Sequence, residues 1–179
     1  RASLETRHAV DLAARLDATF AARFAFEGSM RAAAYERCDE ARGLAAETTR
    51  QTTQAWFLGG AARALALCGD ADAAERLTAR ILTLRPNDTL VVLAGAPTVR
   101  ALNALTRRDP AAAIAALQRL APYEAGLYAG SWPAYVRGRA LLAAGRADEA
   151  VVELAALASH RGQLLMGTFT PPLPPTCSS

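Results

Sequence analysis

The sequence of 179 residues contains no lysine, because all 20 of its basic residues are arginine. This absence excludes three chemistries from the chain: phosphate binding by a P-loop lysine, phosphate binding by a kinase lysine, and Schiff-base catalysis. Histidine is also scarce, with two residues, and cysteine contributes only three. Few metal sites can be built from that set. The composition is therefore more informative about architecture than about chemistry, and we expect neither a metal nor another cofactor.

Cysteine pairs and long apolar runs are missing as well. Cys38, Cys68 and Cys177 are odd in number and lie far apart without a CxxC pair, which predicts three free thiols. No apolar run approaches the about 18 residues that a membrane span needs, and no signal peptide is visible. We expect a cytoplasmic chain without a membrane span. Because it opens with arginine rather than methionine, we interpret it as a piece of a longer protein, for which membrane tethering stays open.

Aromatic residues make up 6% of the chain, and its formal net charge is only +3. Acidic residues are interspersed with the arginines, and the longest basic run is the pair Arg107 and Arg108. Nucleic-acid-binding proteins usually carry a basic stripe with aromatic residues beside it. That stripe is absent here, so we expect no direct contact with nucleic acid.

Alanine dominates what is present, with 44 residues, and together with leucine it favours helix over sheet. Apolar residues recur every three or four positions over 61–67 and 73–84, which predicts two helices. Between them, Gly69 and Asp70 supply a glycine for the end of one helix and a capping residue for the next. Comparable turns occur over 141–150, at Arg108-Asp109-Pro110 and, more weakly, over 35–39.

One alanine recurs five residues beyond each of these turns. The four positions are Ala41, Ala74, Ala113 and Ala150, spaced 33, 39 and 37 residues apart. Periods in this range are typical of two-helix units stacked into a solenoid, and a small side chain lets paired helices approach closely. We predict an all-α superhelix of about four degenerate helix-turn-helix repeats over residues 1–162, followed by a proline-rich irregular tail over 163–179.

Two segments resemble the tetratricopeptide repeat (TPR), a helix-turn-helix unit of about 34 residues. In residues 55–88 the resemblance is carried by Leu58, Ala61, Ala62, Leu65, Ala74, Thr78, Ile81 and Pro86; in residues 131–162 it is carried by Gly138, Leu141, Ala150, Leu154 and Leu157. The signature tryptophan and tyrosine are absent, and Arg100 and Arg137 stand where leucine is usual. We expect these two arginines either to extend toward solvent or to pair with a carboxylate such as Glu124.

A longer resemblance covers about residues 20 to 162. It rests on Leu67-Cys68-Gly69-Asp70, Pro97-Thr98-Val99-Arg100, Ala121-Pro122-Tyr123-Glu124, Pro133-Ala134-Tyr135-Val136-Arg137-Gly138, Ala144-Gly145-Arg146 and His160-Arg161-Gly162. In order and spacing these motifs resemble the repeat region that follows the catalytic domain of bacterial eukaryotic-like serine/threonine protein kinases, especially those of acidobacteria. Similar regions follow winged-helix DNA-binding domains in some regulators. The resemblance implies a sensory or partner-docking appendage of one of these two classes of parent protein.

Catalytic residues are not evident. His160-Arg161-Gly162 superficially resembles a kinase catalytic loop, but glycine replaces the aspartate that accepts the substrate proton. His8 and His160 have no serine or cysteine motif beside them. We therefore expect a non-catalytic module that binds a protein or peptide segment, with self-association as another possible partner class.

In TPR arrays the first helix of each unit lines the concave side. That face, transferred to this chain, predicts eight partner-binding residues: Arg23, Phe26, Met30, Trp56, Arg63, Trp132, Tyr135 and Arg139. Aromatic residues interleaved with arginines are common anchors for peptides and acidic termini. The alternative interpretation is that Trp56 and Trp132 pack against the preceding unit. The sequence leaves the choice open.

Overall fold

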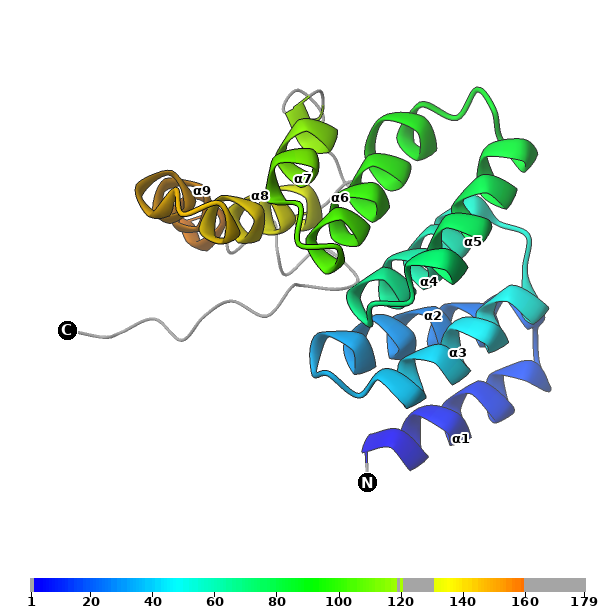
Figure 1. Ribbon diagram of the computed structural model, residues 1–179. Coiled ribbons are helices and arrows are strands. Elements are labelled where there is room, and N and C mark those ends of the chain that lie inside the picture. The colour runs from blue at the N-terminus through cyan, green and yellow to red at the C-terminus, as the bar shows by residue number, and fades with distance from the viewer. Residues whose placement is uncertain (1, 119, 121–130, 160–179) are drawn as a thin grey trace.

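The computed structural model describes residues 2–118, 120 and 131–159, and every regular element within these residues is helical (Figure 1). The elements are α1 (Ala2–Ala14), α2 (Ala18–Ala34), α3 (Cys38–Gln51), α4 (Ala55–Leu67), α5 (Ala71–Leu84), a π-helical turn η1 (Val91–Gly95), α6 (Ala96–Thr106), α7 (Pro110–Leu117), α8 (Trp132–Ala143) and α9 (Ala147–Ser159). The all-α prediction is thereby confirmed for the described part of the chain. The predicted tail over 163–179 and the tripeptide at 160–162 lie outside it.

Four helix hairpins share one turn geometry. They are α2–α3, α4–α5, α6–α7 and α8–α9, and each turn contains a residue with positive φ: Glu36 (59°), Gly69 (75°), Arg108 (59°) and Gly145 (74°). The residue after it donates a backbone hydrogen bond across the turn in every case: Arg37 to Ala32, Asp70 to Leu65, Asp109 to Ala104 and Arg146 to Leu141, at 2.9–3.0 Å. This bond satisfies a carbonyl at the end of the first helix. Four turns of different sequence therefore adopt the same local structure.

The recurring alanine lies five residues beyond each positive-φ residue and faces the interior. Ala41 is 1% exposed, and Ala74, Ala113 and Ala150 are all fully buried. Asp109 accepts a hydrogen bond from the backbone of Ala112 at 2.9 Å, so it caps α7 as its sequence position predicts. Asp70 occupies the equivalent position before α5 but makes no such side-chain bond. The predicted interior position of the alanines is confirmed.

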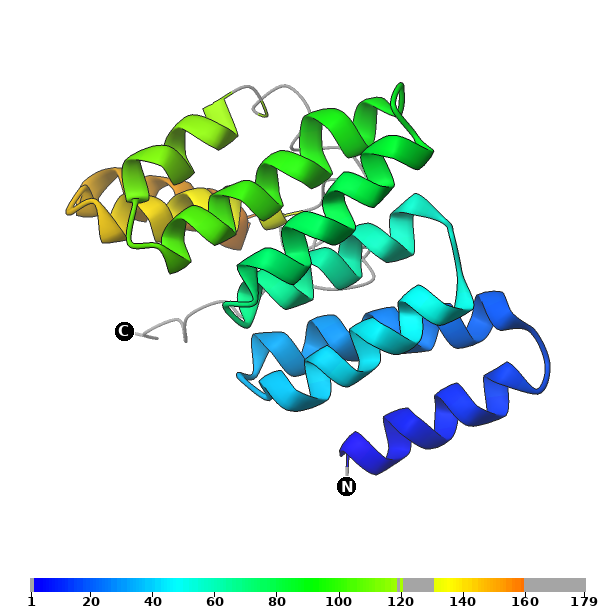
Figure 2. The same ribbon diagram turned by 45° about the vertical axis from the view of Figure 1, so that its right-hand side comes forward.

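The hairpins are stacked so that their first helices contact one another in sequence. α2 contacts α4, α4 contacts α6, and α6 contacts α8, while α1 packs beside α2. Figure 2 shows the successive hairpins side by side, with the helix axes turning along the stack so that α8 and α9 cross the direction of α1 and α2. The core follows the same path, since one buried apolar cluster includes residues of α4, α5, α6, α7 and α8. Because each hairpin covers the next, the array buries its apolar faces collectively.

Two glycines lie where a side chain of a neighbouring helix fills the space that a Cβ would need. A Cβ placed on Gly60 of α4 would lie 2.1 Å from the Cε2 atom of Phe26 on α2, which is far inside van der Waals contact. Gly138 of α8 is similarly close to Leu154 of α9, at 2.7 Å. A Cβ on Gly59, by contrast, would meet nothing within 4 Å. Small residues are therefore required at particular helix contacts and not throughout the helices.

The two arginines that stand at leucine positions lie in different environments. Arg137 of α8 pairs with Glu153 of α9, and both side chains are partly buried. Arg100 is exposed. Arg137 thus pairs with a carboxylate, as one of the two expectations had it, while Arg100 extends toward solvent; Glu124, the carboxylate named as an example, lies outside the described residues. Arg137 therefore joins the two helices of its own hairpin.

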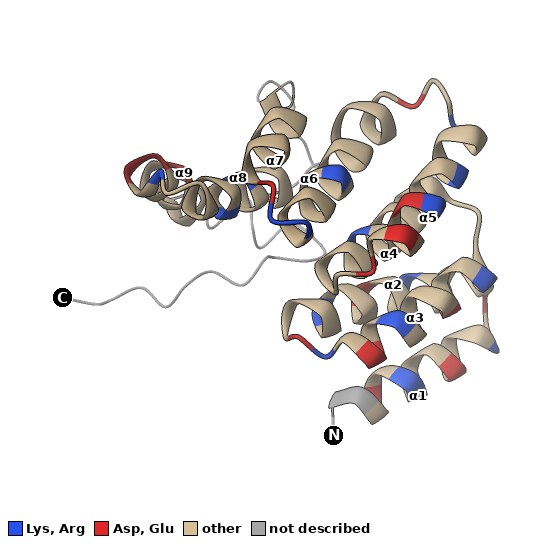
Figure 3. Cartoon of the chain, viewed as in Figure 1, with Lys and Arg blue, Asp and Glu red and all other residues tan. Residues whose placement is uncertain are grey.

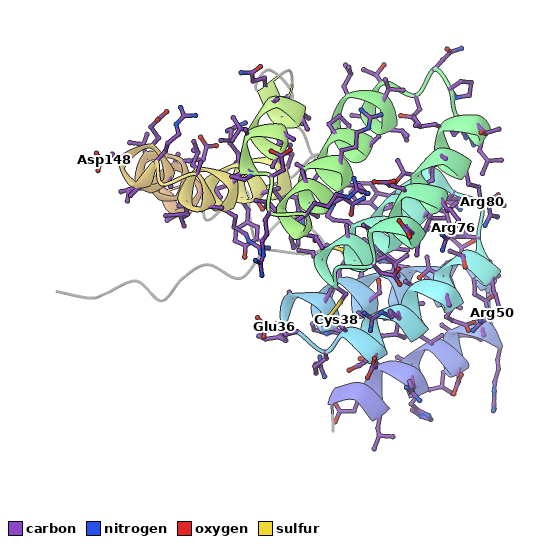
Figure 4. All side chains as sticks on the ribbon, in the orientation of Figure 1. Glu36, Cys38, Arg50, Arg76, Arg80 and Asp148 are labelled. Carbon is purple, nitrogen blue, oxygen red and sulfur yellow. A yellow bond between two sulfur atoms is a disulfide. The ribbon has the colours of Figure 1, made fainter. Side chains whose placement is uncertain are left out.

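The prediction of three free thiols is wrong, because Cys38 and Cys68 form a disulfide with a Cα–Cα distance of 5.4 Å (Figure 4). Cys38 begins α3 and Cys68 ends α4, so the bond joins the turn ends of two consecutive hairpins. Arg42 extends the same link, with its Nε atom 3.6 Å from a carboxylate oxygen of Asp70. The separation of 30 residues is close to one repeat period, which is why stacking brings these distant cysteines together. Cys177 lies outside the described residues.

Charged residues of both signs alternate along the helices, as Figure 3 shows for α1, α3 and α5. Within the described ranges, no group of three or more histidine, cysteine or acidic side chains is placed to hold a metal ion. Among the same residues, no helix combines the length and the apolar character needed to cross a membrane.

Candidate binding face

Seven of the eight predicted binding residues form one connected set of contacts, contributed by α2, α4 and α8. Phe26 and Met30 of α2 and Trp132 of α8 belong to one buried cluster, and the rings of Phe26 and Trp56 are 6.1 Å apart. The eighth residue, Arg23, is exposed and pairs with Glu27 at 2.9 Å. The sequence thus identified residues that meet in space although they come from three different hairpins.

Trp132 is the centre of this set and is only 3% exposed. Its ring packs edge-on against Tyr135 at 5.7 Å, and the guanidinium carbon of Arg63 lies 5.6 Å from its ring centre. Phe26 and Met30 are also buried, at 4% and 0% exposure. Trp132, Phe26 and Met30 therefore lie in the interior, where buried side chains offer no surface to a partner; for Trp132 this burial favours the packing interpretation.

Arg63 occupies an unusual environment in the middle of α4. Its Nε atom is buried and has no hydrogen-bond acceptor, and none of the described acidic residues forms an ion pair with it. Burial alone lowers the pKa of the Arg63 guanidinium to about 10, because no nearby negative charge compensates for the lost hydration. The side chain stays charged at neutral pH, and the face of Trp132 is the contact that offsets part of its desolvation.

The exposed part of the face includes residues that the sequence analysis missed. On α2 the aromatic rings of Phe20 and Phe24 are 56% and 42% exposed, and Arg23 lies between them. Trp56 on α4 is 36% exposed. The spacing of Phe20, Arg23 and Phe24 at three and four residues was a usable signal, because such residues share one side of a helix. The analogy with the first helix of a TPR unit favoured Phe26 and Met30, which lie on an adjacent side of the same helix, instead.

Arg139 completes the exposed set on α8. Its guanidinium carbon lies 5.8 Å from the ring centre of Tyr135, and the side chain is exposed. No described carboxylate lies within ion-pair distance of Arg139. An exposed arginine oriented by an aromatic ring is available to bind an acidic group of a partner.

A cavity of about 100 Å³ opens where α4 and α5 meet η1 and α6. Its lining includes Trp56, Gly59, Arg63, Ile81, Val91 and Val99. Two of the predicted site residues, Trp56 and Arg63, therefore lie on this cavity. The π-helical turn η1 forms one wall, and single turns of this kind are frequent at functional sites.

The comparisons with known proteins yield no relative. The sequence matches no family model, and neither a curated protein nor a solved structure matches the chain.

Proposed function

We propose that this chain is a non-catalytic, TPR-like interaction module whose right-handed superhelix of four hairpins binds a protein segment. The observation that carries the proposal is the exposed aromatic and basic set on the first helices of the hairpins: Phe20, Arg23, Phe24, Trp56 and Arg139. Aromatic residues and arginines dominate the binding energy of protein interfaces. Trp56 packs against the buried Phe26 ring and Arg139 against the Tyr135 ring, which lowers the entropic cost of ordering these two side chains on binding.

Support for the TPR-like architecture comes from the repeated turn. Each hairpin combines a positive-φ residue, the same backbone bond across the turn and a buried alanine five residues later. The consecutive contacts of α2, α4, α6 and α8 place the first helices in one continuous layer. A continuous layer of first helices is the surface that solenoid proteins use for binding.

The parent protein that we propose is a bacterial serine/threonine kinase, with this chain as a docking or sensory appendage. A winged-helix transcriptional regulator, with the chain as its effector or oligomerisation part, is the alternative. Reading the coding sequence upstream separates them. A lysine-bearing nucleotide fold supports the kinase, and a winged helix supports the regulator.

The disulfide changes the compartment that we propose. Disulfides persist in oxidising compartments and are rare in cytosolic proteins. The Cys38–Cys68 bond therefore favours an oxidising compartment over the cytoplasm that the sequence suggested. This placement is compatible with a parent protein that is tethered to a membrane.

Self-association is a second candidate function, favoured by exposed apolar residues on the last hairpin. Val151 and Val152 of α9 are 64% and 71% exposed, and Leu142 of α8 is 51% exposed. Light scattering over a range of protein concentrations tests this candidate. A mass that stays monomeric throughout would exclude it.

Peptide selection tests the interaction module. We expect the whole chain to enrich, from a random displayed library, peptides that combine acidic and apolar residues. Phe24→Ala or Arg139→Ala should weaken the binding of a selected peptide by about tenfold, since each removes an anchor of the exposed set. Arg76→Ala is the matched control, because Arg76 is exposed on α5, a second helix (Figure 4). Failure to enrich any peptide, or equal losses in all three variants, would contradict the proposal.

A further inference from the structure

The cavity beside α4 combines the positive charge of Arg63, whose Nε atom is buried, with apolar walls. Arg63 lies on it, and the buried Nε atom of that residue lacks an acceptor. Ile81 of α5, Val91 of η1 and Val99 of α6 form much of the remaining surface. A buried donor on a charged group is costly unless an acceptor reaches it. The arrangement is therefore incomplete without a negatively charged or strongly accepting group.

The charges on the lining favour a ligand with a single negative charge. Asp88 also lies on the lining, and its Oδ1 atom accepts hydrogen bonds from the backbone N–H groups of Leu90 and Val91, at 3.1 and 3.2 Å. Asp88 does not lie within ion-pair distance of Arg63 in the described structure. A multiply charged group such as phosphate would have one guanidinium to bind it and one carboxylate to repel it. A carboxylate, which accepts two parallel hydrogen bonds from a guanidinium, fits this balance better.

The volume limits the apolar part of the ligand. A cavity of about 150 Å³ accommodates benzene, so the about 100 Å³ found here accommodates an alkyl group of about four carbons. Gly59 lies on the lining, and a Cβ built there would meet no atom within 4 Å, so the space beside α4 is open at that point. A short branched chain would fill it.

We propose that the cavity between α4, α5, η1 and α6 is a binding site for a small branched aliphatic monocarboxylate. The carboxylate pairs with Arg63, and the alkyl group packs against Ile81, Val91 and Val99. This inference goes beyond the peptide-binding face. The two sites share Trp56, but the ligand occupies the interface between two hairpins and not the exposed rings of α2. Binding there would link the second and third hairpins, which gives the array a means of responding to a metabolite.

Isovalerate is the probe, and its neutral amide, isovaleramide, is the matched control ligand. The shift of the Trp56 indole N–H resonance on titration reports occupancy, since Trp56 lies on the cavity. We expect saturable binding of isovalerate with a dissociation constant of about 1 mM and binding of the amide about tenfold weaker or less. Equal responses to the acid and the amide, or no saturation by the acid, would overturn the proposal.

Two variants test the site, one through its charge and the other through its volume. Arg63→Gln removes the charge, and Gly59→Leu fills the cavity while improving the helix propensity of α4. Both should weaken isovalerate binding by about tenfold or more. Arg100→Gln and Gly43→Leu are the controls, because Arg100 is an exposed arginine elsewhere and a Cβ on Gly43 also meets nothing within 4 Å. Retention of binding in Gly59→Leu, checked as folded by circular dichroism, would overturn the site even if Arg63→Gln does not fold.

A peptide that ends in valine distinguishes the source of the carboxylate. If a peptide with a free C-terminus binds more tightly than isovalerate and its amidated form does not bind, the ligand group belongs to a polypeptide. If isovalerate binds more tightly than both peptides, the ligand is a free acid. Binding of the free and amidated peptides with equal affinity would count against carboxylate recognition.

Discussion

Reduction of the Cys38–Cys68 disulfide is expected to lower the free energy of unfolding by about 3.5 kcal/mol. The bond closes a loop with a sequence separation of 30 residues, and loops of about 15 to 100 residues correspond to roughly 3 to 4.7 kcal/mol of chain entropy removed from the unfolded state. A loss of that size is a large fraction of the stability of a typical domain. Urea unfolding followed by circular dichroism, with and without dithiothreitol, measures it.

A Cys177→Ser background removes the third thiol, so that thiol–disulfide exchange with Cys177 does not affect the comparison between the oxidised and reduced chain. In that background, Cys38→Ser with Cys68→Ser should unfold at the same urea concentration as the reduced parent, and dithiothreitol should have no effect on it. Thiol titration of the unreduced, unfolded wild-type chain should find one free thiol. Three free thiols, or an unchanged unfolding midpoint after reduction, would show that the disulfide does not form.

Trp132→Ala is expected to destabilise the chain by about 3–5 kcal/mol, the usual cost of truncating a buried tryptophan. Trp132 is 3% exposed and lies in one buried cluster with residues of α2 and α4, although it belongs to the fourth hairpin. Its ring also provides the contact for the Arg63 guanidinium, which would lose its stacking partner. The variant therefore removes packing and a desolvated cation–π contact together. Chemical denaturation monitored by circular dichroism gives the change.

Trp56→Ala is the matched control. Trp56 is 36% exposed and contacts Phe26 at its ring edge, so its loss should cost about 1 kcal/mol. Equal destabilisation by the two variants would contradict the assignment of Trp132 to the interior. A loss of peptide binding with only this small loss of stability is expected for Trp56→Ala and not for Trp132→Ala.

Residues close together in the sequence were sufficient to predict the hairpin turns. Gly69 and Gly145 mark two turns because glycine adopts positive φ without strain. Glu36 and Arg108 adopt the same conformation at the equivalent turns without being glycine. Arg108-Asp109-Pro110 and, more weakly, residues 35–39 still predicted these turns, and a buried alanine follows each positive-φ residue by five positions. The turns and the buried side of the second helices depend on neighbouring residues, so the sequence predicts them. Helix starts were predicted less well, because the apolar stretches 61–67 and 73–84 begin six and two residues after the first residues of α4 and α5.

Which side chains of the predicted face are buried between hairpins, and which are exposed, was beyond such reasoning. Arg23, Phe26 and Met30 share one stripe of a helical wheel, yet Arg23 is exposed and the other two are buried. The difference arises because Gly60 on α4 leaves space for the Phe26 ring, which is a property of the partner helix. Trp132 meets α4 because the stack curves, and curvature accumulates over all the hairpins between them.

The disulfide was missed for a related reason. Cysteine spacing was read along the chain, whereas the relevant distance is between equivalent ends of stacked hairpins. The cavity at η1 was also unpredictable, since the π-helical turn over 91–95 inserts a wall that ordinary helical periodicity does not anticipate.

The central claim is that glycines at specific positions, which carry no side chain, allow consecutive hairpins to pack closely. Two neighbouring glycines on α4 test this claim most directly. Equilibrium unfolding of Gly60→Ala and Gly59→Ala is the measurement. Gly60→Ala should destabilise the chain by about 1–3 kcal/mol, because its Cβ would overlap the Phe26 ring. Gly59→Ala should stabilise it by up to about 1 kcal/mol through helix propensity alone. If both substitutions stabilise the chain, α2 and α4 do not pack at the distance described, and the account is wrong.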